Sequence, residues 1–224
     1  MIRTAAVVLA ATAAVAAADF ANFDAETEGF KGTSFTTDGI TIFSVNNNSG
    51  LNPDGSTFNP GDYGSEVIIE RALVVFNDFP SVVSAPNMLS FGGSLVPGDN
   101  TSVNLLTEVF MTNNQTATEA SLDLVHFENG PWGGIIIRLD ALDRGAVVAS
   151  DTHTISDLGG RDNPRATHLA VSGVAFDTIR LHAVYPDGTS TVIAGLVDNV
   201  SITPAPASAL AFAGLGLVGV RRRR

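Results

Sequence analysis

Short apolar runs separated by turn-forming residues recur along the chain from residue 39 to residue 202. The runs are rich in Val, Ile, Leu and Phe, and clusters of Gly, Asn, Asp and Pro lie between them. Many short strands with turns between them are typical of a β-sandwich or barrel, and no window has the 3.6-residue period of an amphipathic helix. Strands are predicted at residues 39–45, 66–76, 88–91, 102–111, 121–128, 135–140, 146–152, 168–172, 177–185 and 191–202.

Turn chemistry places two tight turns and one long loop between these strands. Residues 143–145 (Asp-Arg-Gly) are typical of a hairpin tip, and residues 186–188 (Pro-Asp-Gly) are typical of a second turn. The polar stretch 46–64 is longer than most connections, so we expect a surface loop at one end of the sandwich.

The first eighteen residues have the pattern of a secretory signal. Arg3 precedes an apolar run, and three alanines ending at Ala18 offer small residues for cleavage before the polar Asp19. A buried N-terminal helix is the alternative. The positive start and the small residues at the end of the run favour removal after Ala18.

The last twenty-one residues have three ordered features. Pro204 and Pro206 break the chain, an uncharged run covers residues 207–220, and four arginines follow. As a helix the run would span roughly 21 Å, less than the ~30 Å of a bilayer core, and the arginines would hold it at the cytoplasmic face. A packed core helix should not be apolar on all sides and closed by four like charges. The arginines are Arg221, Arg222, Arg223 and Arg224.

This tail resembles the PEP-CTERM sorting signal of exported bacterial proteins, with Pro204-Ala205-Pro206 in place of Pro-Glu-Pro. The resemblance implies export, transient anchoring in the inner membrane, and processing by an exosortase-like enzyme. It also implies delivery to the cell envelope, the cell surface or the extracellular matrix. The missing Glu bears on which processing enzyme accepts the tail. The expected organisation is a signal peptide at 1–18, one domain at 19–203 and a sorting segment at 204–224.

Composition excludes several classes of site and partner. The chain of 224 residues has no cysteine, which excludes a disulfide scaffold, a thiolate zinc site and a cysteine nucleophile. Its formal net charge of −11 argues against a nucleic-acid partner, because phosphate binding needs a basic surface. A hydrophobic fraction of 45% is enough for a substantial core in one domain.

The opening segment at 23–30 (FDAETEGF) and the closing segment at 195–202 (GLVDNVSI) resemble the jelly-roll domains of carbohydrate-binding modules and galactose-binding-like folds. The resemblance implies that the first and last strands lie together, and that an Asp of the closing strand helps to hold a structural calcium. The predicted fold is an all-β antiparallel sandwich of the jelly-roll type. An N-terminal signal helix and a short hydrophobic C-terminal helix would flank it.

Asp198 is the most informative single position of the closing strand. Period-2 alternation places it on the face of Val200 and Ile202, so we expect it to point inward. A buried carboxylate without a partner is expensive, so Asp198 needs a cation, a metal or several hydrogen bonds.

A calcium ion is the first candidate partner of Asp198. In a first strand, Asp24, Glu26 and Glu28 would share one face, and a cluster of carboxylates suits the oxygen-only coordination that Ca²⁺ prefers. Two alternatives remain open. Arg71 could form a salt bridge with Asp198, or Asp198 could cap a turn.

Nothing in the sequence assembles a catalytic site. The histidines are scattered and read as solvated strand residues, and no nucleophile motif accompanies them. A glycan-active hydrolase needs only two nearby carboxylates, so it remains an alternative. The histidines are His126, His153, His168 and His182.

Two aromatic residues are candidate platforms for sugar rings. Trp132 lies in the turn-like stretch 129–134, and Tyr63 lies in the long loop. A half-buried cap on the core is the alternative role for Trp132. The sequence thus predicts an exported, non-catalytic sandwich that binds glycan or matrix components. The alternatives are a purely structural surface protein without a ligand and a hydrolase.

Overall fold

The computed structural model describes residues 17–44, 48–62, 66–71, 83–84, 86–92, 107–127, 132–156 and 164–206. Within these ranges the chain forms β-strands joined by turns and loops, and no helix there is long and apolar enough to cross a membrane. The predicted signal segment up to residue 16 and the sorting segment beyond residue 206 lie outside the described residues.

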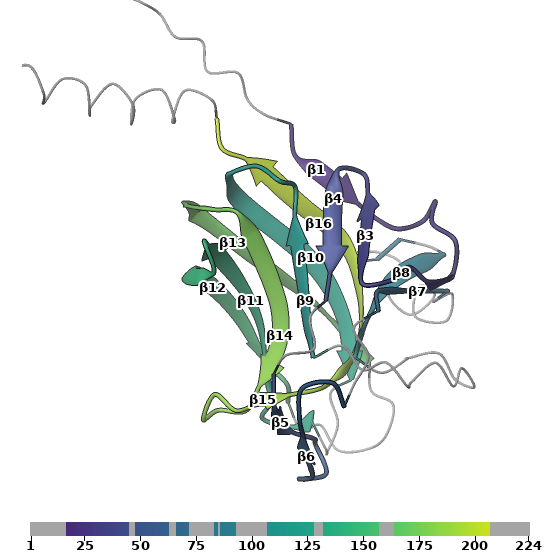
Figure 1. Ribbon diagram of the computed structural model, residues 1–224, viewed down its shortest axis with the longest axis vertical. Helices are drawn as coiled ribbons and strands as arrows, with labels where there is room; N and C mark the ends of the chain where they lie inside the picture. The colour runs from purple at the N-terminus through teal and green to yellow at the C-terminus, as the bar shows by residue number, and fades with distance from the viewer. Residues whose placement is uncertain are drawn as a thin grey trace, which may run out of the picture.

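The strands form two sheets that pack face to face (Figure 1). The first is seven-stranded, in the order β13-β10-β16-β8-β7-β2, and β1 also pairs with β16. Its strands are β1 (Asp19–Ala21), β2 (Gly29–Phe30), β7 (Ile68–Arg71), β8 (Asn87–Gly92), β10 (Ala117–Phe127), β13 (Pro164–Phe176) and β16 (Ala194–Pro204).

The second sheet is nine-stranded, in the order β3-β4-β9-β14-β15-β5-β6, with β11 on the other edge of β14 and β12 beyond β11. Its pairs are antiparallel except for one parallel bridge between β15 and β5. Its strands are β3 (Ser34–Thr37), β4 (Ile40–Phe43), β5 (Gly50–Leu51), β6 (Thr57–Phe58), β9 (Glu108–Thr112), β11 (Ile136–Asp143), β12 (Ala146–Thr154), β14 (Thr178–Val184) and β15 (Ser190–Thr191).

One hydrophobic core lies between the sheets. Alternate residues of the longer central strands enter it, such as Leu122 and Leu124 of β10 in one sheet and Ile179 and Leu181 of β14 in the other. Alternation of this kind is what a sandwich requires, because each sheet buries one face against the other. The predicted all-β antiparallel sandwich is therefore confirmed.

The hairpin tip lies where the sequence predicts it, whereas the shortest strands were not predicted. At the hairpin tip, Arg144 and Gly145 both have positive φ (51° and 81°), as a type I′ turn requires. The stretch 46–64, expected to be a loop, contains β5 and β6 in its described part. These two-residue strands and the polar β3 have too few apolar positions to show a period of two.

The first and last strands lie together, but the first strand is not the expected segment. In β1, Asp19 pairs with Ile202 of β16, whereas residues 23–28 form turns and bends. The segment therefore leaves the sheet just after β1, and alternation does not apply to its acids.

The chain enters β1 and leaves β16 at the same end of the sandwich, because these strands are antiparallel neighbours (Figure 1). The start of β14 lies at this end too, since Asn113 next to it donates to the Asp19 carboxylate at 3.0 Å. The end of β14, together with β5, β6 and β15, forms the opposite end, which we call the distal end.

Candidate functional sites

A β-bulge in β16 shapes the surroundings of Asp198. Asp198 pairs with Asp123 of β10 and Ser201 pairs with Ser121, so β16 has one residue more than its partner over this interval. Asn199, inside the interval, has a positive φ of 51°. An extra residue of this kind shifts the alternation of a strand by one position.

The bulge explains where the sequence prediction for Asp198 was wrong. The core between the sheets contains Val197 before the bulge and Val200 and Ile202 after it. Asp198 therefore lies on the other face of the sheet from Val200 and Ile202. It is nevertheless fully buried, as expected.

Asp198 lies where β16 changes neighbours. β8 pairs with β16 up to Val197, and β1 pairs with it from Val200 onward. In this interval Asp198 Oδ2 accepts hydrogen bonds from the backbone N–H of Ser84 at 2.5 Å and from Ser84 Oγ at 2.9 Å. The other oxygen of Asp198, Oδ1, is buried and has no hydrogen-bond partner in the described part of the chain.

Asp24 presents a second buried oxygen of the same kind. Its Oδ2 accepts from Asn22 Nδ2 at 3.1 Å, while its Oδ1 is buried without a partner among the described residues. Burial raises the pKa of Asp198 to about 6, hydrogen bonds from Ser84 and from the Asn199 backbone oppose this rise, and the negative charge of Asp24 adds a smaller contribution to it. Two carboxylates that repel each other, each with one free buried oxygen, suit a hard cation with oxygen ligands.

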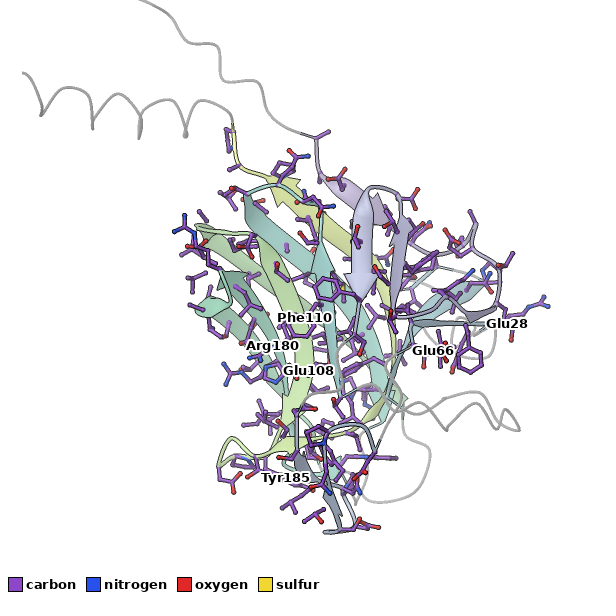
Figure 2. The ribbon with its side chains drawn as sticks, in the orientation of Figure 1. Glu28, Glu66, Glu108, Phe110, Arg180 and Tyr185 are labelled. Carbon is purple, nitrogen blue, oxygen red and sulfur yellow. The ribbon has the colours of Figure 1, made fainter. Side chains whose placement is uncertain are left out.

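The other residues of the predicted calcium cluster lie apart from this pair. Glu26 forms an ion pair with Lys31 at 3.7 Å, and Glu28 is exposed at the side of the molecule (Figure 2). No group of three or more His, Cys, Asp or Glu that could hold a metal occurs among the described residues. Further ligands would therefore be carbonyl or water oxygens.

Of the two alternatives to a metal, the structure favours turn capping. Arg71 is exposed at the end of β7, and the contacts of Asp198 in the described chain do not include it. The predicted salt bridge is therefore wrong. Asp198 instead accepts both the backbone and the side-chain donor of Ser84, which ties residues 83–84 to β16.

Trp132 lies at the distal end, in the turn that precedes β11. Its carbonyl accepts from Ile135 N–H at 3.0 Å, and the next residue along, Ile136, pairs with Val184 at the end of β14. The indole is partly exposed and packs against the core, as does the ring of Tyr185. Tyr63, the other predicted platform, lies outside the described residues.

The prediction that the histidines are solvated is wrong for two of them. His126 is fully buried, with Nε2 2.9 Å from Thr167 Oγ1, and His182 is buried as well. His168 is exposed, and its Nδ1 lies 2.8 Å from the carboxylate of Asp123. His126 is buried because it shares the core-facing side of β10 with Leu122 and Leu124, whereas His182 lies on the outer face of β14 and is covered there by neighbouring side chains.

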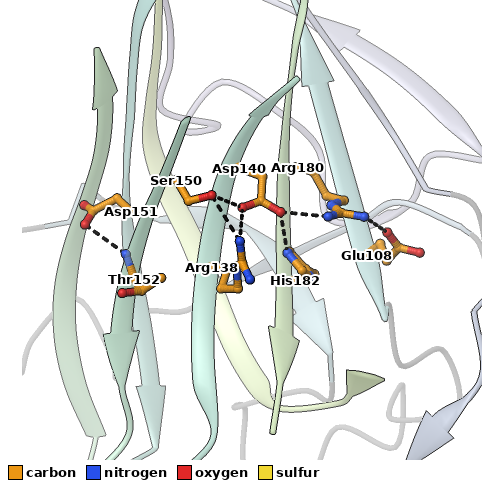
Figure 3. Close-up of polar contacts among 8 residues, drawn as sticks. All are labelled: Glu108, Arg138, Asp140, Ser150, Asp151, Thr152, Arg180 and His182. Atoms are coloured by element: carbon orange, nitrogen blue, oxygen red, sulfur yellow. Dashed lines mark hydrogen bonds and ion pairs between the residues drawn. The ribbon is translucent and has the colours of Figure 1, made fainter. Parts of the chain in front are cut away.

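The sequence analysis missed a polar network on the outer face of the nine-stranded sheet (Figure 3). Asp140 of β11 is fully buried at its centre. Its Oδ1 accepts from Arg138 at 3.0 Å and from Ser150 at 2.5 Å, and its Oδ2 lies 2.7 Å from Arg180 and 2.8 Å from His182. Burial alone would raise the pKa of Asp140, but the hydrogen bonds from these neighbours outweigh it and lower the pKa.

The network continues across the sheet to an aromatic pair. Arg180 also pairs with Glu108 at 3.3 Å. Phe110 of β9 lies opposite Arg180, and its ring stacks on that of Phe43 with centroids 5.3 Å apart. The sequence shows polar residues alternating with the core residues of β11 and β14, but only the strand register brings Asp140 beside Arg180.

The network holds its central carboxylate in the charged form. Asp140 keeps its charge at neutral pH, since its pKa is lowered, so it cannot supply a proton as a glycosidase acid must. Glu108 is held by the same arginine. The arrangement offers fixed hydrogen-bond donors and acceptors next to apolar rings.

No protein-family model matches the chain, and no curated protein matches its sequence. Among solved structures, it is similar to adhesin domains of Lys-gingipain. The K2 domain gives a TM-score of 0.47 at 13% identity, covering 84% of this chain and 99% of that one. The K1 and K3 domains from Porphyromonas gingivalis W83 give 0.41 at 10% and 0.31 at 8%, covering 84% of this chain and 99% and 100% of theirs. Likenesses this low establish neither a shared family nor a shared function.

Proposed function

We propose that this chain is an exported, non-catalytic β-sandwich of the cell surface or extracellular matrix that binds glycan through its distal end. The observation that carries the proposal is topological. The chain enters the sandwich through β1 and leaves it through β16, and both strands open at the same end of the sandwich. Trp132 lies at the opposite, distal end. An anchor or sorting tail following residue 206 would therefore direct Trp132 away from the membrane.

Delivery would depend on the two terminal segments. The pattern of residues 1–18 supports export, and the tail with Pro204 and Pro206 supports recognition by an exosortase-like enzyme while the chain is held in the inner membrane. Processing would release the sandwich into the envelope or matrix.

The partly exposed indole of Trp132 supports the glycan contact. An indole in this setting offers one apolar face for stacking on a pyranose ring, while its inner part stays packed on the core. The formal net charge of −11 favours a partner other than nucleic acid.

We further propose that Ca²⁺ binds Asp198 and Asp24 and stabilises the sandwich. The buried Oδ1 of each carboxylate supports this proposal, because neither oxygen has a hydrogen-bond partner among the described residues and the charge of Asp24 acts on Asp198. A bound cation would offset their repulsion and fasten the segment after β1 to the last strand.

Trp132 is the only tryptophan of the chain, so its fluorescence reports directly on the proposed contact. The full chain and its variants are titrated with soluble polysaccharides by calorimetry, and in the unmodified chain the Trp132 emission is followed as well. We expect saturable binding with a shift of the emission. Trp132→Ala should weaken binding at least about tenfold, or about 1.4 kcal/mol, and Trp132→Phe should retain most of it.

Phe30→Ala serves as the control, because Phe30 is 54% exposed and lies on β2, outside the distal end. Thermal melts of each variant separate loss of binding from loss of folding. Absence of binding to every polysaccharide would favour the structural surface protein without a ligand. Binding that is indifferent to Trp132→Ala and leaves the emission unchanged would remove Trp132 from the site.

A further inference from the structure

One row of side chains crosses five strands on the outer face of the nine-stranded sheet. The register pairs each member with the next, from β4 through β9, β14 and β11 to β12. At ~4.8 Å between strands, the row is roughly 19 Å long, which exceeds one sugar ring. We call it the outer-face row, and it consists of Phe43, Phe110, Arg180, Asp140 and Ser150.

The row has an apolar half and a polar half. Phe43 and Phe110 are half-buried and stack nearly parallel, at an interplanar angle of 10°, so they form one apolar surface patch, and Phe110 lies next to Arg180. Such a surface accepts the C–H face of a sugar ring, and the polar groups beside it can bond to the ring's hydroxyls.

The polar half is fixed in place before any ligand arrives. Arg138 and Arg180 are each held by one oxygen of the buried Asp140, yet their side chains remain 34% and 26% exposed. Groups locked in this way lose little conformational entropy on binding, which favours affinity. Figure 2 shows Phe110, Arg180 and Glu108 close together on this side of the sandwich.

The charges of the network compensate one another. Two arginines, Arg138 and Arg180, face two carboxylates, Asp140 and Glu108, within the same set of ion pairs. The face therefore has strong hydrogen-bond groups without excess positive charge, on a chain that is acidic as a whole. This favours an uncharged, hydroxyl-rich ligand over an anionic one.

We propose that the outer-face row is a second binding site, which takes a neutral oligosaccharide with one ring on Phe110 and Phe43 and hydroxyls on Arg180 and Arg138. This inference rests on the proposed glycan-binding function but assigns a separate surface. Trp132 packs against the core on the inner side of the sheet, whereas the row lies on the outer side. The two sites can therefore be tested independently.

The experiment titrates the full chain with a neutral β-glucan, a neutral galactomannan and an acidic polyuronate, by calorimetry and by Trp132 emission. We expect a neutral polysaccharide to bind, and Phe110→Ala and Arg138→Gln each to weaken that binding at least about tenfold, or about 1.4 kcal/mol. The matched controls are Phe30→Ala and Arg144→Gln, since Phe30 is 54% exposed and the Arg144 side chain is 91% exposed at the hairpin tip. Both controls should bind as the unmodified chain does.

Arg138→Gln keeps a donor for Asp140, so it tests the site even if Phe110→Ala fails to fold. Binding that survives both substitutions and is lost in Trp132→Ala overturns the outer-face row and leaves the distal site intact. Preference for the polyuronate overturns the neutral ligand class. Absence of binding to all three polysaccharides overturns both sites.

Discussion

Replacing Asp198 by Asn should have opposite effects with and without calcium. The substitution removes the buried negative charge of Asp198 but keeps an oxygen that can accept from Ser84. In chelator, the variant should be more stable than the unmodified chain, because it no longer buries a negative charge and no longer repels Asp24. In Ca²⁺, it should lose the stabilisation that the ion provides.

The raised pKa of Asp198 sets the size of the effect. A folded-state pKa of about 6, against an ordinary value of 3.8, means that keeping Asp198 ionised at pH 7 costs about 3 kcal/mol, at roughly 1.4 kcal/mol per pKa unit. For a chain of this size, the melting temperature should rise by roughly 6–12 °C in the chelated variant. The sign follows from linkage: without calcium, stability falls as the pH rises from about 4 through 6, and Asp198→Asn should remove that fall.

The assay is thermal unfolding of the full chain and the variant, each in EDTA and in Ca²⁺, at pH 5 and pH 7. Glu28→Gln is the matched control, since it removes one negative charge from an exposed neighbour of the same segment. It should shift neither the melting temperature in chelator nor the response to calcium.

Two results would refute this reasoning. Equal melting temperatures of Asp198→Asn and the unmodified chain in EDTA would mean that burying the Asp198 charge beside Asp24 costs no stability. An equal rise on adding Ca²⁺ would mean that Asp198 is not a ligand, and turn capping of Ser84 would then be its role.

The remaining predictions concern the outer-face network and the tail. Asp140→Asn should destabilise the chain by about 3–5 kcal/mol in urea unfolding, because it breaks a buried ion-pair network, while Asp143→Asn at the exposed end of β11 should change little. The pKa of Asp140 is lowered, so the stabilisation from its charge is fully present above pH 3.8, its ordinary pKa. The difference in unfolding free energy between Asp140→Asn and the unmodified chain should therefore shrink only below that pH. Intact mass of the protein from its native host should lack Arg221–Arg224, and finding them would make the tail a plain anchor.

Most of the fold could be predicted from the sequence, because strand rhythm and turn chemistry are local. The main strands and the hairpin tip at 143–145 depend only on residues close in the chain. The shortest strands, β5 and β6, could not be predicted, since two residues hold no period. They pair with each other, and within the described chain only the bridge from Gly50 of β5 to Ser190 of β15 pairs them with the rest of the sheet.

For the candidate sites too, some properties could be predicted from the sequence and others depend on the tertiary structure. The sequence by itself determined that Asp198 is buried within the last strand and needs a partner. Only the tertiary structure decided which partner, because the bulge at Asn199 shifts the alternation and places Asp198 beside Asp24 and Ser84.

The outer-face network depends most clearly on the tertiary structure. The sequence determined that Arg138 and Asp140 alternate with core residues on β11, and that Arg180 does so on β14. Their ion pairs depend on the register between strands some forty residues apart in the chain, with Arg180 opposite Asp140. Pairing register is set by the packing of the whole sandwich, so no local pattern could have revealed it.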